Sequence, residues 1–155
     1  MLKAVRDVIA SRIHPQAEHA TDESDAQALR VAAAALLFEV SRIDGEVGPD
    51  ERTVMRAAIQ GLLGLSADET EELLGLAEEE SHHAVSVYEF TKVLDRGLLP
   101  DEKKRIVELL WLVAFADAGK SALEEHLIRK IAGLLHVPHP DFIDAKIRAR
   151  EARDR

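Results

Sequence analysis

The stretch that decides the fold is residues 29–51, which read LRVAAAALLFEVSRIDGEVGPDE. Apolar residues recur at the three- and four-residue spacing of one helix face, and the other faces of the first half are apolar as well. This pattern predicts a central, buried helix over residues 25–43. Asp44 and Gly45 then end it, because they are turn formers, and Pro49 suits the first turn of a following helix. The stretch therefore predicts a helix, an acidic turn and a second helix.

Helical spacing continues along the rest of the chain, and a sustained β-branched alternation is found nowhere. Serines followed three residues later by Glu mark further helix starts, because this pair forms a capping box. We predict an all-α helical bundle of about seven to eight helices. The predicted helices span residues 2–13, 25–43, 49–63, 67–80, 87–97, 100–116, 122–135 and a last segment from about residue 140.

The predicted helices group into one principal domain. Residues 1–24 are expected to form an N-terminal helix and linker, since residues 14–23 have no apolar period. Residues 25–148 are expected to form the helical domain, and residues 149–155 a charged tail. A chain of 155 residues is the usual length of a single domain.

Composition excludes several classes of protein. The formal net charge is −9, which argues against nucleic acid as a partner, because phosphate binding needs a basic surface. The chain has no cysteine, so disulfides, thiol chemistry and zinc fingers are excluded. The longest apolar run, residues 31–38, is too short for a membrane span, and the N-terminus has no secretory signal pattern. The lack of cysteine fits a reducing compartment.

An internal repeat relates the two halves of the predicted bundle. Two long apolar helices each run into a turn that contains Asp, and each turn leads into an amphipathic helix. Asp44 and Asp117 lie 73 residues apart, and so do Glu51 and Glu124. This regularity predicts two pseudo-repeated helix-turn-helix halves.

The first acidic turn is a candidate cation site. Asp44, Glu46, Asp50 and Glu51 place four carboxylates within eight residues, and hard divalent cations prefer such oxygen ligands. The alternative is structural, because Glu51 is positioned to cap its own helix and to meet the helix dipole favourably. The second turn is the weaker candidate, because Lys120 places a positive charge inside it.

Other motifs give no sign of catalysis. A glycine-rich phosphate loop, a nucleophile elbow and a metalloprotease HExxH pattern are all missing, so we predict that the chain is not an enzyme. Glu39 is expected to pair with Arg42, one helical turn later. Residues 66–80 hold seven carboxylates and no Lys or Arg, which indicates either a solvated helix face or a docking surface for a basic partner.

Three phrases resemble the tellurite-resistance TerB family, including its uncharacterised bacterial branch and the related N-terminal domain of DjlA co-chaperones. They are LLFEVSRIDGEV at residues 36–47, EEHLIRKIA at residues 124–132 and LLHVPHPDFI at residues 134–143. The resemblance covers about residues 25–148. It implies an all-helical, pseudo-duplicated bundle in the bacterial cytoplasm that attaches to other proteins, often alongside membrane-associated partners.

The resemblance also implies a divalent-cation site at the acidic turns. Carried over to this sequence, its ligands are Asp44, Glu46 and Glu51 in the first turn, with Asp117 and Glu124 in the second. Weak binding of Ca²⁺ or Mg²⁺ is therefore the expectation for a cofactor. In the second turn the sequence departs from the family pattern at residues 118–120.

The functional expectation is a non-catalytic interaction or adaptor module in a bacterial, tellurite-type stress response, with weak divalent-cation binding at the turns. Two alternatives stay open. One is an ion-independent protein-interaction module that uses the acidic helix face of residues 66–80. The other is a metal-assisted hydrolase, which would need inward-facing ligands and an open coordination position.

Overall fold

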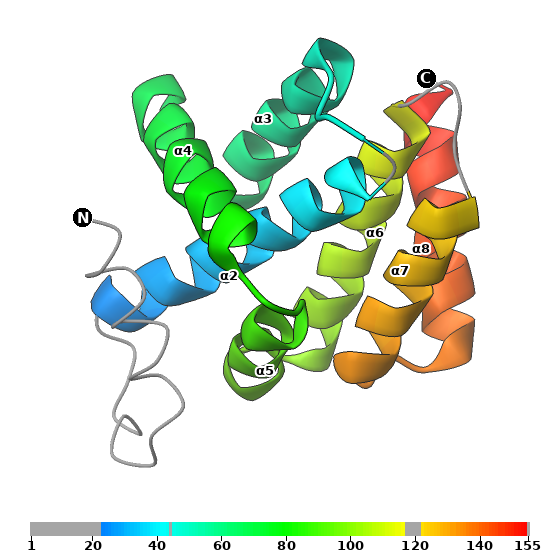
Figure 1. Ribbon diagram of the computed structural model, residues 1–155. Coiled ribbons are helices and arrows are strands. Elements are labelled where there is room, and N and C mark those ends of the chain that lie inside the picture. Colours follow the sequence, from blue (N-terminus) through cyan, green and yellow to red (C-terminus); the bar gives the residue numbers. More distant parts are fainter. Residues whose placement is uncertain (1–22, 44, 117–121, 155) are drawn as a thin grey trace.

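Helix α2, Glu23–Arg42, is the centre of the bundle (Figure 1). The computed structural model describes residues 23–43, 45–116 and 122–154. All residues of α2 from Val31 to Phe38 are buried, which is why the sequence there is apolar on every face. The helix packs against α3, α4, α5, α6 and α7. Its run of alanines, residues 32–35, lets these neighbours approach closely.

Helices α3, Pro49–Leu63, and α4, Ala67–His83, pack together beside α2. Helix α3 begins at Pro49 after Gly48 and ends at Gly64, whose φ of +65° is the left-handed conformation that glycine adopts readily. Ser66 caps α4 by accepting a hydrogen bond from the backbone N–H of Glu69, at 3.1 Å. The acidic side chain of Glu69 in turn accepts from the Ser66 backbone N–H, so the predicted capping box is confirmed.

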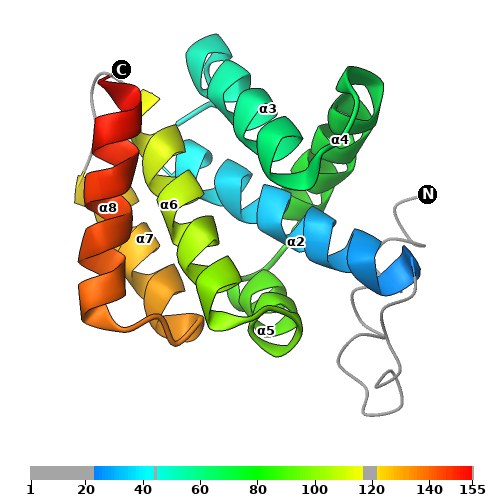
Figure 2. The ribbon, with the colours of Figure 1, turned by 180° about the vertical axis from the view of Figure 1, so that it is seen from behind.

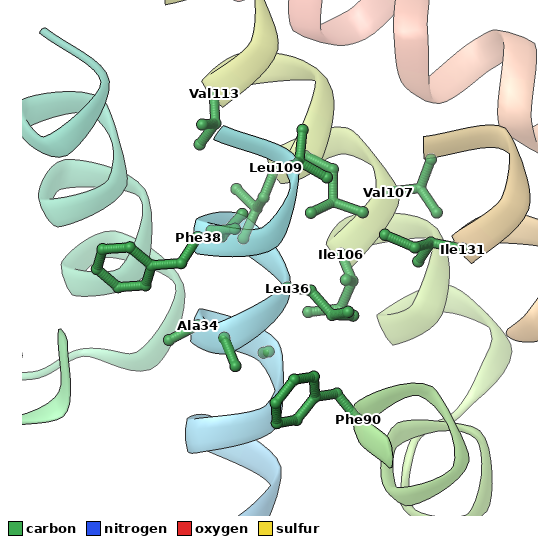
Figure 3. Close-up of a cluster of buried hydrophobic side chains, with 14 of the residues drawn as sticks. Ala34, Leu36, Phe38, Phe90, Ile106, Val107, Leu109, Val113 and Ile131 are labelled. Carbon is green, nitrogen blue, oxygen red and sulfur yellow. The ribbon is translucent and has the colours of Figure 1, made fainter. Parts of the chain in front are cut away.

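Helices α5, Tyr88–Gly97, α6, Pro100–Ala116, and α7, Ala122–Leu134, complete the surroundings of α2. In both ribbon views α3 and α4 lie on one side of α2, with α5 on the other (Figures 1 and 2). Figure 3 shows how the core forms where side chains of α2, α5, α6 and α7 meet. The labelled core residues are Ala34, Leu36, Phe38, Phe90, Ile106, Val107, Leu109, Val113 and Ile131, all of them buried.

Helix α8, His139–Arg153, packs along α6 on the outer side of the bundle. Phe142 of α8 lies against Trp111 of α6, with ring centroids 5.7 Å apart. Basic side chains of α8 cover the α6 aromatics: Lys146 lies 4.8 Å from the Trp111 ring centroid and Arg153 lies 5.0 Å from that of Phe115. The aromatic residues of α6 are therefore core residues that basic side chains of α8 cover.

The observed helices agree closely with the prediction of an all-α bundle. The expected N-terminal helix over residues 2–13 lies outside the described residues. Ser24 stands three residues before Gln27, a pair that predicts a capping box with Ser24 as the N-cap of a helix from residue 25. This prediction is wrong, because Ser24 lies inside α2, which begins at Glu23. Helix α8 extends to Arg153, past the tail boundary predicted at residue 148. The pseudo-repeat of the two halves stays a prediction.

Candidate functional site

The first acidic turn joins the end of α2 to the start of α3. Asp44, its first predicted ligand, lies outside the described residues. Glu46 is exposed in the connection, and Asp50 is exposed in the first turn of α3. Neither carboxylate has a hydrogen-bond or ion-pair partner among the described residues. Both remain available to a ligand from solution.

Glu51 differs from these two carboxylates because it is buried, with 8% of its surface exposed. One carboxylate oxygen, Oε1, accepts a hydrogen bond from the Gly48 backbone N–H at 3.1 Å, which caps the start of α3. The other oxygen, Oε2, accepts from the Ser41 hydroxyl of α2 at 2.5 Å. Glu51 thus ties the last turn of α2 to the first turn of α3. The cap on α3 is the structural role that the spacing suggested, and the bond to Ser41 is an addition that the spacing did not predict.

The second acidic turn is described only from Ala122 onward, so Asp117 lies outside the described residues. Glu124 stands in the first turn of α7 and is fully buried, with 0% exposed. Glu51 and Glu124 are therefore both buried, and each is the third residue of its helix. Within residues 23–43, 45–116 and 122–154, no three His, Asp or Glu side chains are close enough together to hold a metal ion. Cation binding at the turns stays a prediction.

Helix α4 carries its carboxylates on two different faces. Glu71 and Glu78 point to α3, where they pair with Arg56 and, at 3.3 Å, with Arg52. Glu80 is buried. Glu69 caps the start of the helix. The three carboxylates that remain lie on one face of the helix, because they are four and seven residues apart. We call this set the acidic stripe, and it consists of Asp68, Glu72 and Glu79, all exposed and with no ion-pair partner among the described residues.

A polar cleft of about 370 Å³ lies where α2 ends beside the α4–α5 connection and α7. Arg42 donates to the Glu39 carboxylate at 3.1 Å, so the ion pair predicted from their spacing is confirmed. Arg42 also donates to the hydroxyl of Ser81 at 2.6 Å. Burial raises the pKa of Glu39, although the Arg42 charge and the Ser81 hydrogen bond act in the opposite direction.

Sequence reasoning missed this cleft as a site. Ser81 lies 39 positions after Arg42, so no local pattern joins the two residues. The signal that could have found it is Glu39 itself, a carboxylate inside the most apolar helix of the chain. Lys130 of α7 and His82 also line the cleft. Lys130 and His82 could contact a small polar ligand in the cleft. Arg42 already donates hydrogen bonds to Glu39 and Ser81.

The bundle, its acidic stripe and its acidic turn define a small all-helical module with polar contact faces. The family model for tellurite resistance protein TerB matches residues 30–147, from the first half of α2 to the middle of α8. The chain belongs to this family. No curated protein and no solved structure matches the chain. Among the described helices, none combines the length and the apolar character needed to cross a membrane.

Proposed function

We propose that the chain is a non-catalytic interaction module of a tellurite-type stress response in the bacterial cytoplasm, and that it binds a basic segment of a partner protein. The observation that carries this proposal is the acidic stripe on α4. Its carboxylates face solvent, while neighbouring acids of the same helix are neutralised by arginines of α3. A membrane-associated partner would bind in the same way, because the contact depends only on the basic segment that meets the acidic stripe.

The stripe carries an electrostatic cost in the isolated protein. Asp68 and Glu72 are like charges four residues apart on one helix face, a pairing that destabilises a helix by roughly 0.2–0.5 kcal/mol. A cationic partner would remove this repulsion and replace it with attraction. Contacts of this kind are screened by salt, so the complex should weaken as ionic strength rises.

The test uses a synthetic Lys/Arg-rich helical peptide as the probe and isothermal titration calorimetry in a chelator buffer. The stripe is neutralised in the triple variant Asp68→Asn, Glu72→Gln and Glu79→Gln. The control neutralises three exposed carboxylates elsewhere, which changes the net charge equally. Its substitutions are Glu46→Gln, Asp50→Asn and Glu151→Gln.

We expect the peptide affinity to fall about 3-fold to 150-fold in the stripe variant, from roughly 0.2–1 kcal/mol for each exposed ion pair lost. The control variant should bind like the unchanged protein. Equal weakening in both triple variants would mean that only net charge matters, and the stripe would then not be a docking surface.

A second candidate function is weak binding of Ca²⁺ or Mg²⁺ at the first acidic turn, which would fix the angle between α2 and α3. It is favoured by the carboxylates of Glu46 and Asp50, which are exposed, have no partner within the part of the chain that the structure describes, and lie beside the buried Glu51. The predicted ligands are Asp44, Glu46 and Glu51, with Asp117 and Glu124 at the second turn. Hard cations prefer such carboxylate oxygens.

Amide NMR shifts recorded while Ca²⁺ and then Mg²⁺ are added to metal-free protein test this second function. The control is the variant Asp44→Asn with Glu46→Gln, which leaves the helix cap at Glu51 intact. We expect localised shifts at Gly45–Gly48 that vanish in the variant. Unchanged spectra at millimolar concentrations would exclude the site and leave the ion-independent module.

A further inference from the structure

An apolar groove of about 500 Å³ opens along the first half of α2. Its walls come from the end of α3, the end of α5 and the start of α6, elements that Figure 2 shows around α2. Of the five leucines that line it, four are only half-buried and still expose apolar surface: Leu29, Leu62, Leu63 and Leu98. A cavity of this size and lining is typical of a binding site rather than of a packing defect.

The rim of the groove carries charges of both signs, with acids in excess once its surroundings are included. Arg30 of α2 lines the groove on one side, and Asp101, Glu102 and Arg105 of α6 line it as well. A neighbouring depression shares Arg30 and adds Glu69 and Glu72 of α4. An occupant that combines an aliphatic stripe with a net positive charge would therefore fit both the floor and the rim.

We propose that the occupant is the segment of residues 2–13 of this same chain, bound in cis. Its apolar side chains Leu2, Val5, Ile9 and Ile13 recur at helical spacing and form one stripe. The same segment has three basic residues and one acidic residue, so it is net positive. An amphipathic helix that lays its apolar stripe into a hydrophobic groove is a common mode of recognition.

The position of the segment along the chain favours the cis arrangement. The groove begins at Ala26, three residues after α2 starts at Glu23, and residues 14–22 join the segment to α2. A nine-residue connection reaches up to about 30 Å, enough to return the segment to a groove at its own helix. A short tether gives an effective concentration in the millimolar range, so an intrinsic Kd tighter than about 1 mM fills the groove.

This inference goes beyond the proposed function and does not rest on it, because the groove itself is lined mainly by apolar side chains of α2, α3 and α6. Of the acidic stripe, only Glu72 lies nearby, in the neighbouring depression. Occupation of the groove would cover the exposed leucines and attach the N-terminal segment to α3, α5 and α6.

Paramagnetic NMR on the full chain tests the proposal. The chain has no cysteine, so the single substitution Ser11→Cys, on the side opposite the apolar stripe, accepts one nitroxide label without background. We expect loss of amide signal intensity at Leu62, Leu63 and Leu98, which line the groove. The signal of Ala149, near the far end of α8, should keep its intensity.

Two labelled variants separate specific docking from proximity alone. Ile9→Asp places a charge on the apolar stripe and should abolish the broadening at the groove. Ala4→Asp adds the same charge off the stripe and should leave the broadening in place. If both variants behave alike, or if the broadening falls outside the groove, the proposal is wrong.

A mixing experiment then tests the cis arrangement. Nitroxide-labelled protein without isotopes is mixed with isotope-labelled protein that carries no nitroxide. We expect no broadening in this sample. Broadening at the groove residues would show that the segment enters a second copy of the chain, and the cis proposal would be overturned.

Discussion

Removing the Glu51 carboxylate should destabilise the protein far more than removing its neighbour, Asp50. In the structure Glu51 is buried and accepts two hydrogen bonds, one from the Gly48 N–H at 3.1 Å and one from the Ser41 hydroxyl at 2.5 Å. Loss of a helix cap costs about 0.5–2 kcal/mol. Loss of a hydrogen bond to a charged group costs about 1.5–3 kcal/mol. Glu51→Ala should therefore lower the free energy of unfolding by about 2–5 kcal/mol.

The assay is urea and thermal unfolding followed by circular dichroism. For a chain of this length about 2–4 °C of Tm is lost for each kcal/mol, so Glu51→Ala should lower the Tm by roughly 4–20 °C. The matched control is Asp50→Ala, which removes an exposed carboxylate one residue away. It should cost only about 0.3–1 kcal/mol, the value of an exposed acid at a helix N-terminus.

A double-mutant cycle with Ser41→Ala isolates the contact between α2 and α3. Ser41 is fully buried, and its hydroxyl donates to Glu51. We expect a coupling free energy of at least about 0.5 kcal/mol between Ser41→Ala and Glu51→Ala. Equal losses for Glu51→Ala and Asp50→Ala, or strictly additive losses in the cycle, would refute the reasoning that Glu51 ties the two helices together.

Three further predictions concern ionisation and backbone conformation. The hydrogen bond from Lys104 lowers the pKa of Asp144. The pair therefore stabilises the fold fully at pH values above the ordinary aspartate pKa of 3.8, and this contribution is lost as the pH falls through the pKa of the folded state. In urea unfolding, the difference in stability between the unchanged protein and Asp144→Asn should be constant near neutral pH and shrink below pH 3.8. Burial raises the pKa of Glu39, so carbon-detected NMR should place its titration midpoint above the ordinary 4.5; a midpoint at or below that value contradicts the buried environment. Gly61→Ala should stabilise α3 by up to about 0.5–1 kcal/mol, because Gly61 has helical backbone in the last turn of α3 and open space around it. Gly64→Ala should cost about 1–2 kcal/mol, because the φ of Gly64 is +65°. Thermal unfolding should show opposite signs for the two variants.

Local features of the fold were predictable from the sequence, and contacts between distant segments were not. The start of α3 could be predicted from Gly48 and Pro49, because both act on their own helix end. The pairing of Glu39 with Arg42 could be predicted for the same reason, since the two residues are one turn apart. The carboxylate of Glu51 shows the limit: its cap on α3 follows from spacing, whereas its bond to Ser41 depends on the angle between two helices.

In the candidate site, too, local features were predictable from the sequence and contacts between helices were not. The acidic run of α4 is visible in the sequence, but its separation into paired and unpaired carboxylates is not. Arg52 and Arg56 of α3 neutralise Glu78 and Glu71, and only the packing of α3 on α4 decides which acids meet an arginine. The apolar groove was equally hidden, because its half-buried leucines come from α2, α3 and the residue that follows α5, segments that sequence periodicity treats separately.

The central position of α2 sets how the sequence can change over evolutionary time. Each face of α2 serves a different neighbour, so a larger side chain at Ala32 or Ala35 would need compensating changes in several helices at once. Helix α8 packs chiefly on α6 and carries much of its contact through long basic side chains, which adapt more easily. Substitutions should therefore accumulate slowly in α2 and faster in α8, and new binding specificities should arise first on the outer helices.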